Sequence, residues 1–253
     1  MYNLIKSEWY KLRKDRSFRT LAMMIVALSI FWPLYWHFDN LLDGDPLFTG
    51  FESFQRAIAG NTLIFKVSLC ILAGFFISSE YSTGVMKNIA SSGNSRIEIF
   101  TAKLCVYAWG AILLSLLFPL LNMGISTILS GFGEMDNQSA ALLVLRSTLF
   151  TMLYAASFAS IAALFAITFT NNGKSIATSI IFLLAIDVVF TNISENIPIF
   201  ETAYENSVFS LVGDIGSISP SSTELWRLTL VPILTFAVCG LAGCWIYKRK
   251  EIK

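Results

Sequence analysis

Hydrophobic residues form six long runs along the chain, separated by shorter polar segments. The runs cover about residues 20–37, 62–79, 104–129, 142–168, 175–191 and 228–247. A helix of about 20 apolar residues crosses a hydrocarbon core of roughly 30 Å. Because each run is continuous rather than alternating with a period of two, the pattern favours helices over a β-barrel. It predicts an all-α, polytopic membrane protein with six transmembrane helices.

Composition and charge agree with this class and orient the chain. Hydrophobic residues make up 55% of the sequence and charged residues only 14%, which leaves too little polar surface for a soluble domain of this size. Most of the 18 lysines and arginines lie before the first run, in the second and fourth connections and in the tail; the exceptions are Arg56, Lys66, Arg146 and Arg227. Positively charged residues stay on the cytoplasmic side, so both termini are predicted to be cytoplasmic.

The segment before the first run, residues 1–18, has the pattern of an amphipathic helix. Tyr2, Ile5, Trp9 and Leu12 fall on one arc at 100° per residue, with basic residues beside them. Aromatic side chains prefer the headgroup level, and lysines and arginines are attracted to anionic lipids. The segment is predicted to lie along the inner membrane surface, with lipid as its partner. The alternative is a basic tail that only obeys the charge rule.

The second connection reads as helix, turn and helix. Val85, Met86 and Ile89 share one face of a short helix, and the polar stretch after it breaks that helix. Ser95 and Glu98 then form a capping box that starts the helix leading into the third run. A short cytoplasmic helix with an apolar face, held between two spans, is suited to docking on another protein. A solvated hairpin is the alternative.

Two charged residues lie inside the apolar runs. Lys66 in the second run and Asp187 in the fifth are each placed about one turn below the outer surface. A charge within the bilayer is costly unless it is paired or reaches the interface. The sequence therefore predicts an intramembrane Lys66–Asp187 pair at the outer ends of two spans, with separate snorkelling as the alternative.

Candidate chemistry is sparse. The single histidine, His37, cannot supply a histidine-based metal site or a Ser-His-Asp triad without partners, and the four cysteines all fall in apolar runs. Gly173-Lys174-Ser175 ends like a phosphate-binding loop, but Thr168 stands where that loop needs glycine, and an apolar span precedes it. We therefore expect no catalytic site and no metal site in this chain.

Two motifs carry a family resemblance. The second connection contains Glu80-Tyr81-x-x-Gly84-Val85-Met86-Lys87-Asn88, followed by Ser95-Arg96 and Lys103, and the chain opens with Lys6-Ser7-Glu8-Trp9-Tyr10-Lys11-Leu12. The first motif resembles the first cytoplasmic connection of type 2 ATP-binding-cassette (ABC) exporter permeases. The second resembles the opening of short bacterial members, such as bacitracin and lantibiotic resistance permeases.

The resemblance implies a division of roles along the chain. Residues 1–18 correspond to the family's elbow helix, residues 80–98 to its cytoplasmic coupling segment, and residues 192–227 to an extracellular segment that re-enters the outer leaflet. The residues implied in ATPase coupling are Glu80, Tyr81, Gly84, Val85, Met86, Lys87, Asn88 and Ile89.

The resemblance also implies partners. They are two cytosolic ABC ATPase subunits, which bind ATP and Mg, and a second permease copy or paralogue, while this chain binds no cofactor and is no enzyme. No nucleic acid partner is implied. The expected function is ATP-driven export of an amphipathic or hydrophobic substrate, such as an antimicrobial peptide, across a bacterial cytoplasmic membrane. An ion-gradient-driven secondary transporter and a non-transporting regulatory membrane subunit remain the alternatives.

Overall fold

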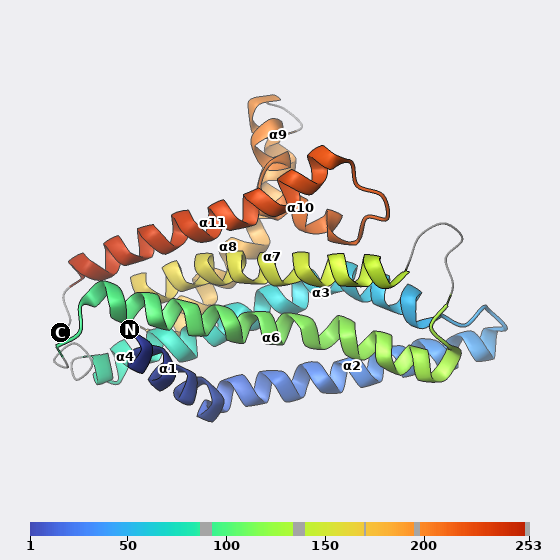
Figure 1. The fold of residues 1–253 in the computed structure, drawn as a ribbon, viewed down its shortest axis with the longest axis horizontal. Helices are drawn as coiled ribbons and strands as arrows, with labels where there is room; N and C mark the ends of the chain where they lie inside the picture. The colour runs from blue at the N-terminus through green and yellow to red at the C-terminus, as the bar shows by residue number, and fades with distance from the viewer. Residues whose placement is uncertain (87–92, 134–139, 170, 195–197, 251–253) are drawn as a thin grey trace.

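The computed structural model is built of helices (Figure 1). It describes the whole chain except residues 87–92, 134–139, 170, 195–197 and 251–253. In the described residues no strand occurs. The helices are α1 (Tyr2–Lys14), α2 (Arg16–Asp43), α3 (Gly50–Ala73), α4 (Ser79–Ser82), α6 (Arg96–Ser130), α7 (Ala140–Thr168), α8 (Asn172–Ser194), α9 (Pro198–Glu205), α10 (Val208–Leu211) and α11 (Ser222–Arg249), with a π-helical turn η1 (Gly74–Ser78) and a 3-10 turn η2 (Val212–Gly216).

Six helices of the described chain are long and apolar enough to cross a membrane, which confirms the predicted all-α, six-span class. They are α2, α6, α7, α8, α11 and the stretch Gly50–Ser82. This last stretch is continuous and contains α3, η1 and α4. Several extend well beyond the apolar runs. The 35 residues of α6 give a length of about 50 Å, more than the hydrocarbon core needs. Its first two turns, from Arg96 to Lys103, therefore extend beyond the apolar run.

Capping boxes fix where three of these helices begin. Ser95 and Glu98 exchange the reciprocal side-chain and backbone hydrogen bonds at the start of α6, and Thr49 with Glu52 and Ser221 with Glu224 do the same for α3 and α11. Each box satisfies two amide groups that the first helical turn would otherwise leave without partners. Helix starts at the membrane surface are thus set by local sequence.

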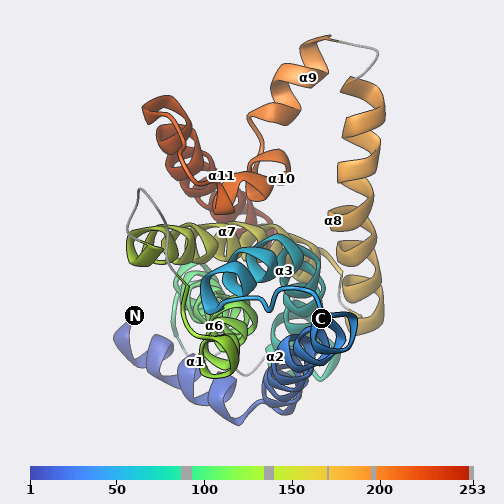
Figure 2. The ribbon, with the colours of Figure 1, turned by 90° about the vertical axis from the view of Figure 1, so that its right-hand side faces the viewer.

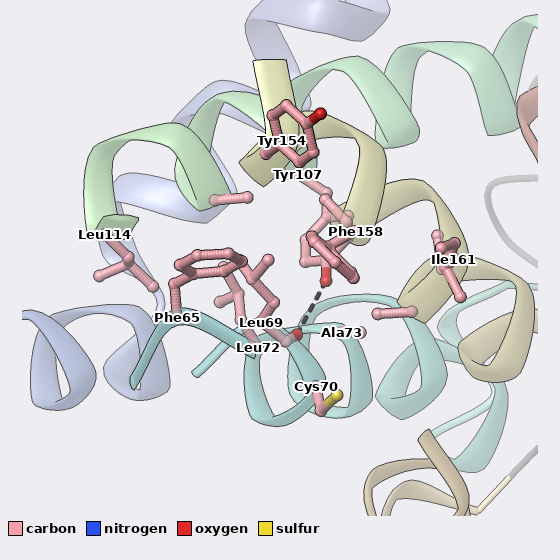
Figure 3. Packing of buried hydrophobic residues seen from close by; sticks show 14 of the residues in the cluster. Phe65, Leu69, Cys70, Leu72, Ala73, Tyr107, Leu114, Tyr154, Phe158 and Ile161 are labelled. Carbon is pink, nitrogen blue, oxygen red and sulfur yellow. Dashed lines mark hydrogen bonds between the residues drawn. The ribbon is translucent and has the colours of Figure 1, made fainter. Parts of the chain in front are cut away.

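The buried centre of the bundle is formed by α3, α6 and α7. Phe65, Leu69, Tyr107 and Phe158 pack there, and the Tyr107 hydroxyl donates to the Leu69 carbonyl over 2.8 Å (Figure 3). By contrast, most of the apolar stretch of α2, α8 and α11 is exposed in the single chain. In Figure 2, α11 lies above the central helices and α8 lies to their right, with α9 at the top. These exposed apolar faces suit lipid contact.

Segment 192–227, predicted to lie outside or to re-enter the outer leaflet, contains the end of α8, then α9, α10 and η2. The apolar residues Val208 and Leu211 are buried against the bundle. Ser147 of α7 donates to the Ile215 carbonyl over 3.0 Å, and the Arg146 guanidinium donates to the Ser217 carbonyl. The start of α7 therefore holds this segment in place.

Helix α1 is joined to α2 through the single residue Asp15 and packs beside α6. Tyr2, Ile5 and Trp9 are exposed. Leu12, which the sequence pattern placed on the same arc, is instead buried, with its methyl groups against Gly110 of α6. Leu12 lies at the edge of the arc, and the missing side chain at Gly110 leaves room for it. One face of α1 is therefore apolar and exposed, while Leu12 packs into the bundle.

Candidate functional site

Four charged side chains meet where α1, α4 and α6 come together at one end of the bundle. The Lys103 ammonium lies 2.9 Å from Glu8 and 2.8 Å from Glu80. The Lys11 ammonium lies 2.7 Å from Glu8 and 3.2 Å from Glu80. We call Glu8, Lys11, Glu80 and Lys103 the junction cluster. Each acid contacts both bases, so the cluster is a closed ring with no net charge.

Burial makes this ring a structural element rather than a surface feature. Lys103 is 1% exposed, and the Glu8 and Glu80 side chains are nearly buried, whereas Lys11 faces solvent at the rim. The Lys103 ammonium also lies 5.1 Å from the centre of the Phe76 ring, which attracts a cation. A buried charge is tolerated only when its partners are in place. The cluster therefore fixes α1 to the ends of α4 and α6.

The two cluster members on α1 show the effect of this pairing on proton affinity. Burial by itself raises the pKa of Glu8, but the charge of Lys103 and the hydrogen bonds from both lysines outweigh it, so the pKa lies below its ordinary value. Burial lowers the pKa of Lys11, but hydrogen bonds and charges from Glu8 and Glu80 outweigh it, so that pKa is raised. Both groups are therefore held in their charged forms.

These shifts predict a pH window for the stability that the cluster contributes. A lowered acid pKa gives stability that is present above the ordinary value of 4.5 and is lost as the pH falls further, while a raised lysine pKa gives stability that is lost above 10.5. We expect the difference in melting temperature between the native protein and Glu8→Gln to be constant near neutral pH and to shrink below about pH 4.5. A difference that does not change on acidification would contradict this role of Glu8.

The predicted coupling segment begins directly after the cluster residue Glu80. Its backbone turns at Gly84, where φ is +73°, a left-handed conformation that favours glycine. Helical structure resumes at Val85 and Met86, and Lys87, Asn88 and Ile89 lie outside the described residues. Val85 is 40% exposed. The structure thus presents Val85 outward from a turn whose shape requires Gly84.

Met86 is not on that outward face. Its side chain is 1% exposed, and the Tyr247 hydroxyl at the end of α11 lies 2.9 Å from its sulfur. Tyr247 also stacks on Phe100 and meets Tyr81 edge-on, with ring centres 5.7 and 6.4 Å apart. In the single chain this contact covers the Met86 side chain, and its implied role in ATPase coupling stays a prediction. Local periodicity could not reveal that α11, far along the chain, returns to cover Met86.

The end of α11 contributes further contacts to the same region. Arg96 donates to the carbonyls of Lys248 and Lys250, over 3.2 and 2.7 Å. The Lys250 ammonium donates to the Ile167 carbonyl at the end of α7 and lies 4.3 Å from the centre of the Tyr81 ring. Ends of α7, α6 and α11 therefore converge on the segment that follows Glu80. In Figure 1, α1, α4 and this end of α11 lie at the same end of the molecule.

Lys66, at the middle of the continuous helical stretch Gly50–Ser82, forms an ion pair with Asp187 of α8. The Lys66 ammonium is 2.8 Å from an Asp187 carboxylate oxygen, which joins α3 to α8. It also lies 4.9 Å from the centre of the Phe158 ring on α7 and 5.5 Å from that of Phe209 on α10. Lys66 is buried, whereas Asp187 is about one-third exposed. This one lysine thus connects four helices.

We expect Lys66→Met and Asp187→Asn each to destabilise the folded chain by about 2 kcal/mol, the scale of a hydrogen bond to a charged group. The exchanged pair, Lys66→Asp with Asp187→Lys, should recover part of that loss, because the opposite charges are restored. Melting temperatures in one detergent would show the effect. Losses in the exchanged variant equal to the sum of the single losses would mean that the two residues are not coupled.

Sequence reasoning missed the junction cluster as a unit. Glu8 and Lys103 stand in the two family-like motifs, but their pairing depends on α1 crossing α6. One signal was available: Lys103 directly precedes the third apolar run, where a buried base needs an acid. The His37 ring lies 3.4 Å from the Ser130 hydroxyl and edge-on to Phe38, so in the described residues its contacts are those of packing near the end of α2.

Together, the six candidate spans and the helix α1 that precedes them define a polytopic membrane protein. The family described as ABC-2 family transporter protein matches residues 4–190. The chain therefore belongs to the ABC-2 transporter family and is a multi-pass membrane permease, a transport component that is not itself catalytic. Permeases of this family work with ABC ATPases. No curated protein matched the sequence.

Proposed function

We propose that this chain is the permease subunit of an ATP-driven exporter and that separate cytosolic ATPase subunits drive it by docking on residues 80–98. The observation that carries the proposal is the exposed Val85 beside a segment braced by charged and aromatic contacts. ATP and Mg are bound by the ATPase in this account. This chain supplies the docking surface to which the ATPase transmits its conformational change.

Contacts of the coupling segment with α1 and α11 would transmit a movement of the docking surface to these helices. A displacement of the coupling segment acts on α1 through Glu80 and the lysines, and on α11 through Met86 and Tyr247. Packed and hydrogen-bonded contacts of this kind carry a shift from one element to the next rather than absorbing it. The segment is therefore able to move a peripheral span, α11, against the central helices.

The exposed apolar faces support the proposed substrate class and assembly. Most of the apolar stretch of α2, α8 and α11 is uncovered in the single chain, so a second permease copy or paralogue has large apolar surfaces to pack against. A path formed between such faces favours an amphipathic or hydrophobic substrate, for which an antimicrobial peptide is our candidate.

Reconstitution tests the proposal. The chain, co-expressed with an ABC ATPase from the same organism and placed in proteoliposomes, should give a complex that hydrolyses MgATP, and a hydrophobic cationic peptide should raise the rate. The matched control is the same complex carrying an ATPase that cannot hydrolyse ATP. Failure of the native pair to co-purify, or transport that continues without ATP, would contradict the proposal.

A further inference from the structure

The first turns of α2 carry an open groove that the proposed transport function does not use. The groove has a volume of about 550 Å³ and is lined by Arg16, Phe18, Arg19, Thr20, Ala22 and Met23. Arg16, Arg19, Thr20 and Met23 are spaced at i, i+3, i+4 and i+7, so they form one stripe along the helix. The stripe changes from cationic to apolar as α2 enters the membrane.

The two arginines are available for a ligand. Both are exposed, and among the described residues neither has a carboxylate within ion-pair distance. The nearest acid in sequence, Asp15, is already engaged, because its carboxylate accepts from the Phe18 amide over 2.9 Å and caps α2. The positive charge here thus comes from guanidinium groups, which bind phosphate oxygens in a two-pronged geometry.

The level of the groove in the membrane and its apolar lining indicate which kind of anion it binds. It lies where α1, predicted to follow the inner membrane surface, turns into the first span, which is the level of lipid headgroups. Beyond the arginines the stripe ends in Met23, an apolar side chain that is 64% exposed near the start of the first span. A soluble anion would use only the cationic half of such a surface, whereas a phospholipid uses both halves.

We propose that this groove binds one anionic phospholipid of the inner leaflet, with the headgroup phosphate between Arg16 and Arg19 and an acyl chain along Phe18, Ala22 and Met23. Arg19 already donates to the Lys14 carbonyl at the end of α1 over 3.3 Å. A phosphate held by Arg19 therefore also stabilises the corner between α1 and α2. This site does not depend on an ATPase.

Native mass spectrometry of the full chain tests the site, with phosphatidylglycerol or phosphatidylcholine added to the detergent-solubilised protein. We expect phosphatidylglycerol to bind at least about tenfold more tightly, and Arg16→Gln with Arg19→Gln to reduce its affinity to that of phosphatidylcholine. Arg16→Lys with Arg19→Lys keeps the charge but not the planar fork, so it should retain part of the preference. If the glutamine variant does not fold, the lysine variant still tests the site, because it keeps the positive charge.

The matched control is Lys6→Gln with Arg13→Gln, which removes the same charge from exposed positions on α1 outside the groove. It should keep the preference for phosphatidylglycerol. Equal loss in the control would mean diffuse attraction to the basic surface, and equal affinity for the two lipids in the native protein would mean no headgroup recognition. Displacement by soluble glycerol phosphate at equal concentration would mean a free-phosphate site. Each of these results would overturn the proposal.

Discussion

Lys103→Met is expected to remove most of the folded protein from the membrane. The substitution leaves Glu8 and Glu80 buried with only the rim residue Lys11 to balance them. Removing one partner of a buried ion pair costs about 3–5 kcal/mol, because the remaining charge stays without compensation. That is a large share of the roughly 5–15 kcal/mol by which a folded domain is stable. Membrane abundance and melting temperature would measure the loss.

A second substitution separates charge balance from packing. Glu8→Gln added to Lys103→Met leaves Lys11 and Glu80 as one neutral pair, 3.2 Å apart. The double variant should therefore be more stable than Lys103→Met alone. If the two losses simply add, the cluster is not a coupled unit and does not connect α1 to the coupling segment.

The second large effect is expected on ATPase binding rather than on folding. Val85→Asp places an unpaired charge on the exposed residue that we assign to the docked surface, so the affinity for the ATPase should fall by at least about 100-fold, or roughly 2.7 kcal/mol. Membrane abundance should stay near that of the native protein. Ile218→Asp, at a similarly exposed apolar residue near the opposite end of α11, is the control for a new surface charge.

Met86→Asp should behave differently from Val85→Asp although the residues are neighbours. Met86 is buried against Tyr247, so a carboxylate there would lose its hydration, and the folded chain itself should be lost. Pulse-labelled protein half-life, compared between the two variants, shows the contrast. Normal stability of Met86→Asp would mean that the α11 contact is not formed.

The sequence predicted those features that depend on local physics. Continuous apolar runs specified six spans, and Ser95 with Glu98 specified the start of α6. Both signals are contained within one or two helical turns. The turn at Gly84 was not predicted, and its left-handed backbone supplies the physical reason for glycine there.

What the sequence did not predict depends on how distant elements meet. Glu8 and Lys103 are far apart along the chain and become partners only because α1 crosses α6. The same is true of Met86 and Tyr247, whose contact buries the Met86 side chain. Leu12, predicted on the membrane-facing arc, is buried for a similar reason, since Gly110 of α6 leaves space for its side chain. In each case one helix stripe was ambiguous until its tertiary neighbour was known.

Site-specific photo-crosslinking is the most direct test of the coupling account. A photoreactive amino acid at Val85 should crosslink to the ATPase in native membranes, and the same probe at Leu42, exposed at the far end of α2, should not. An ATPase that co-purifies with the chain but crosslinks at neither position would contradict docking on residues 80–98.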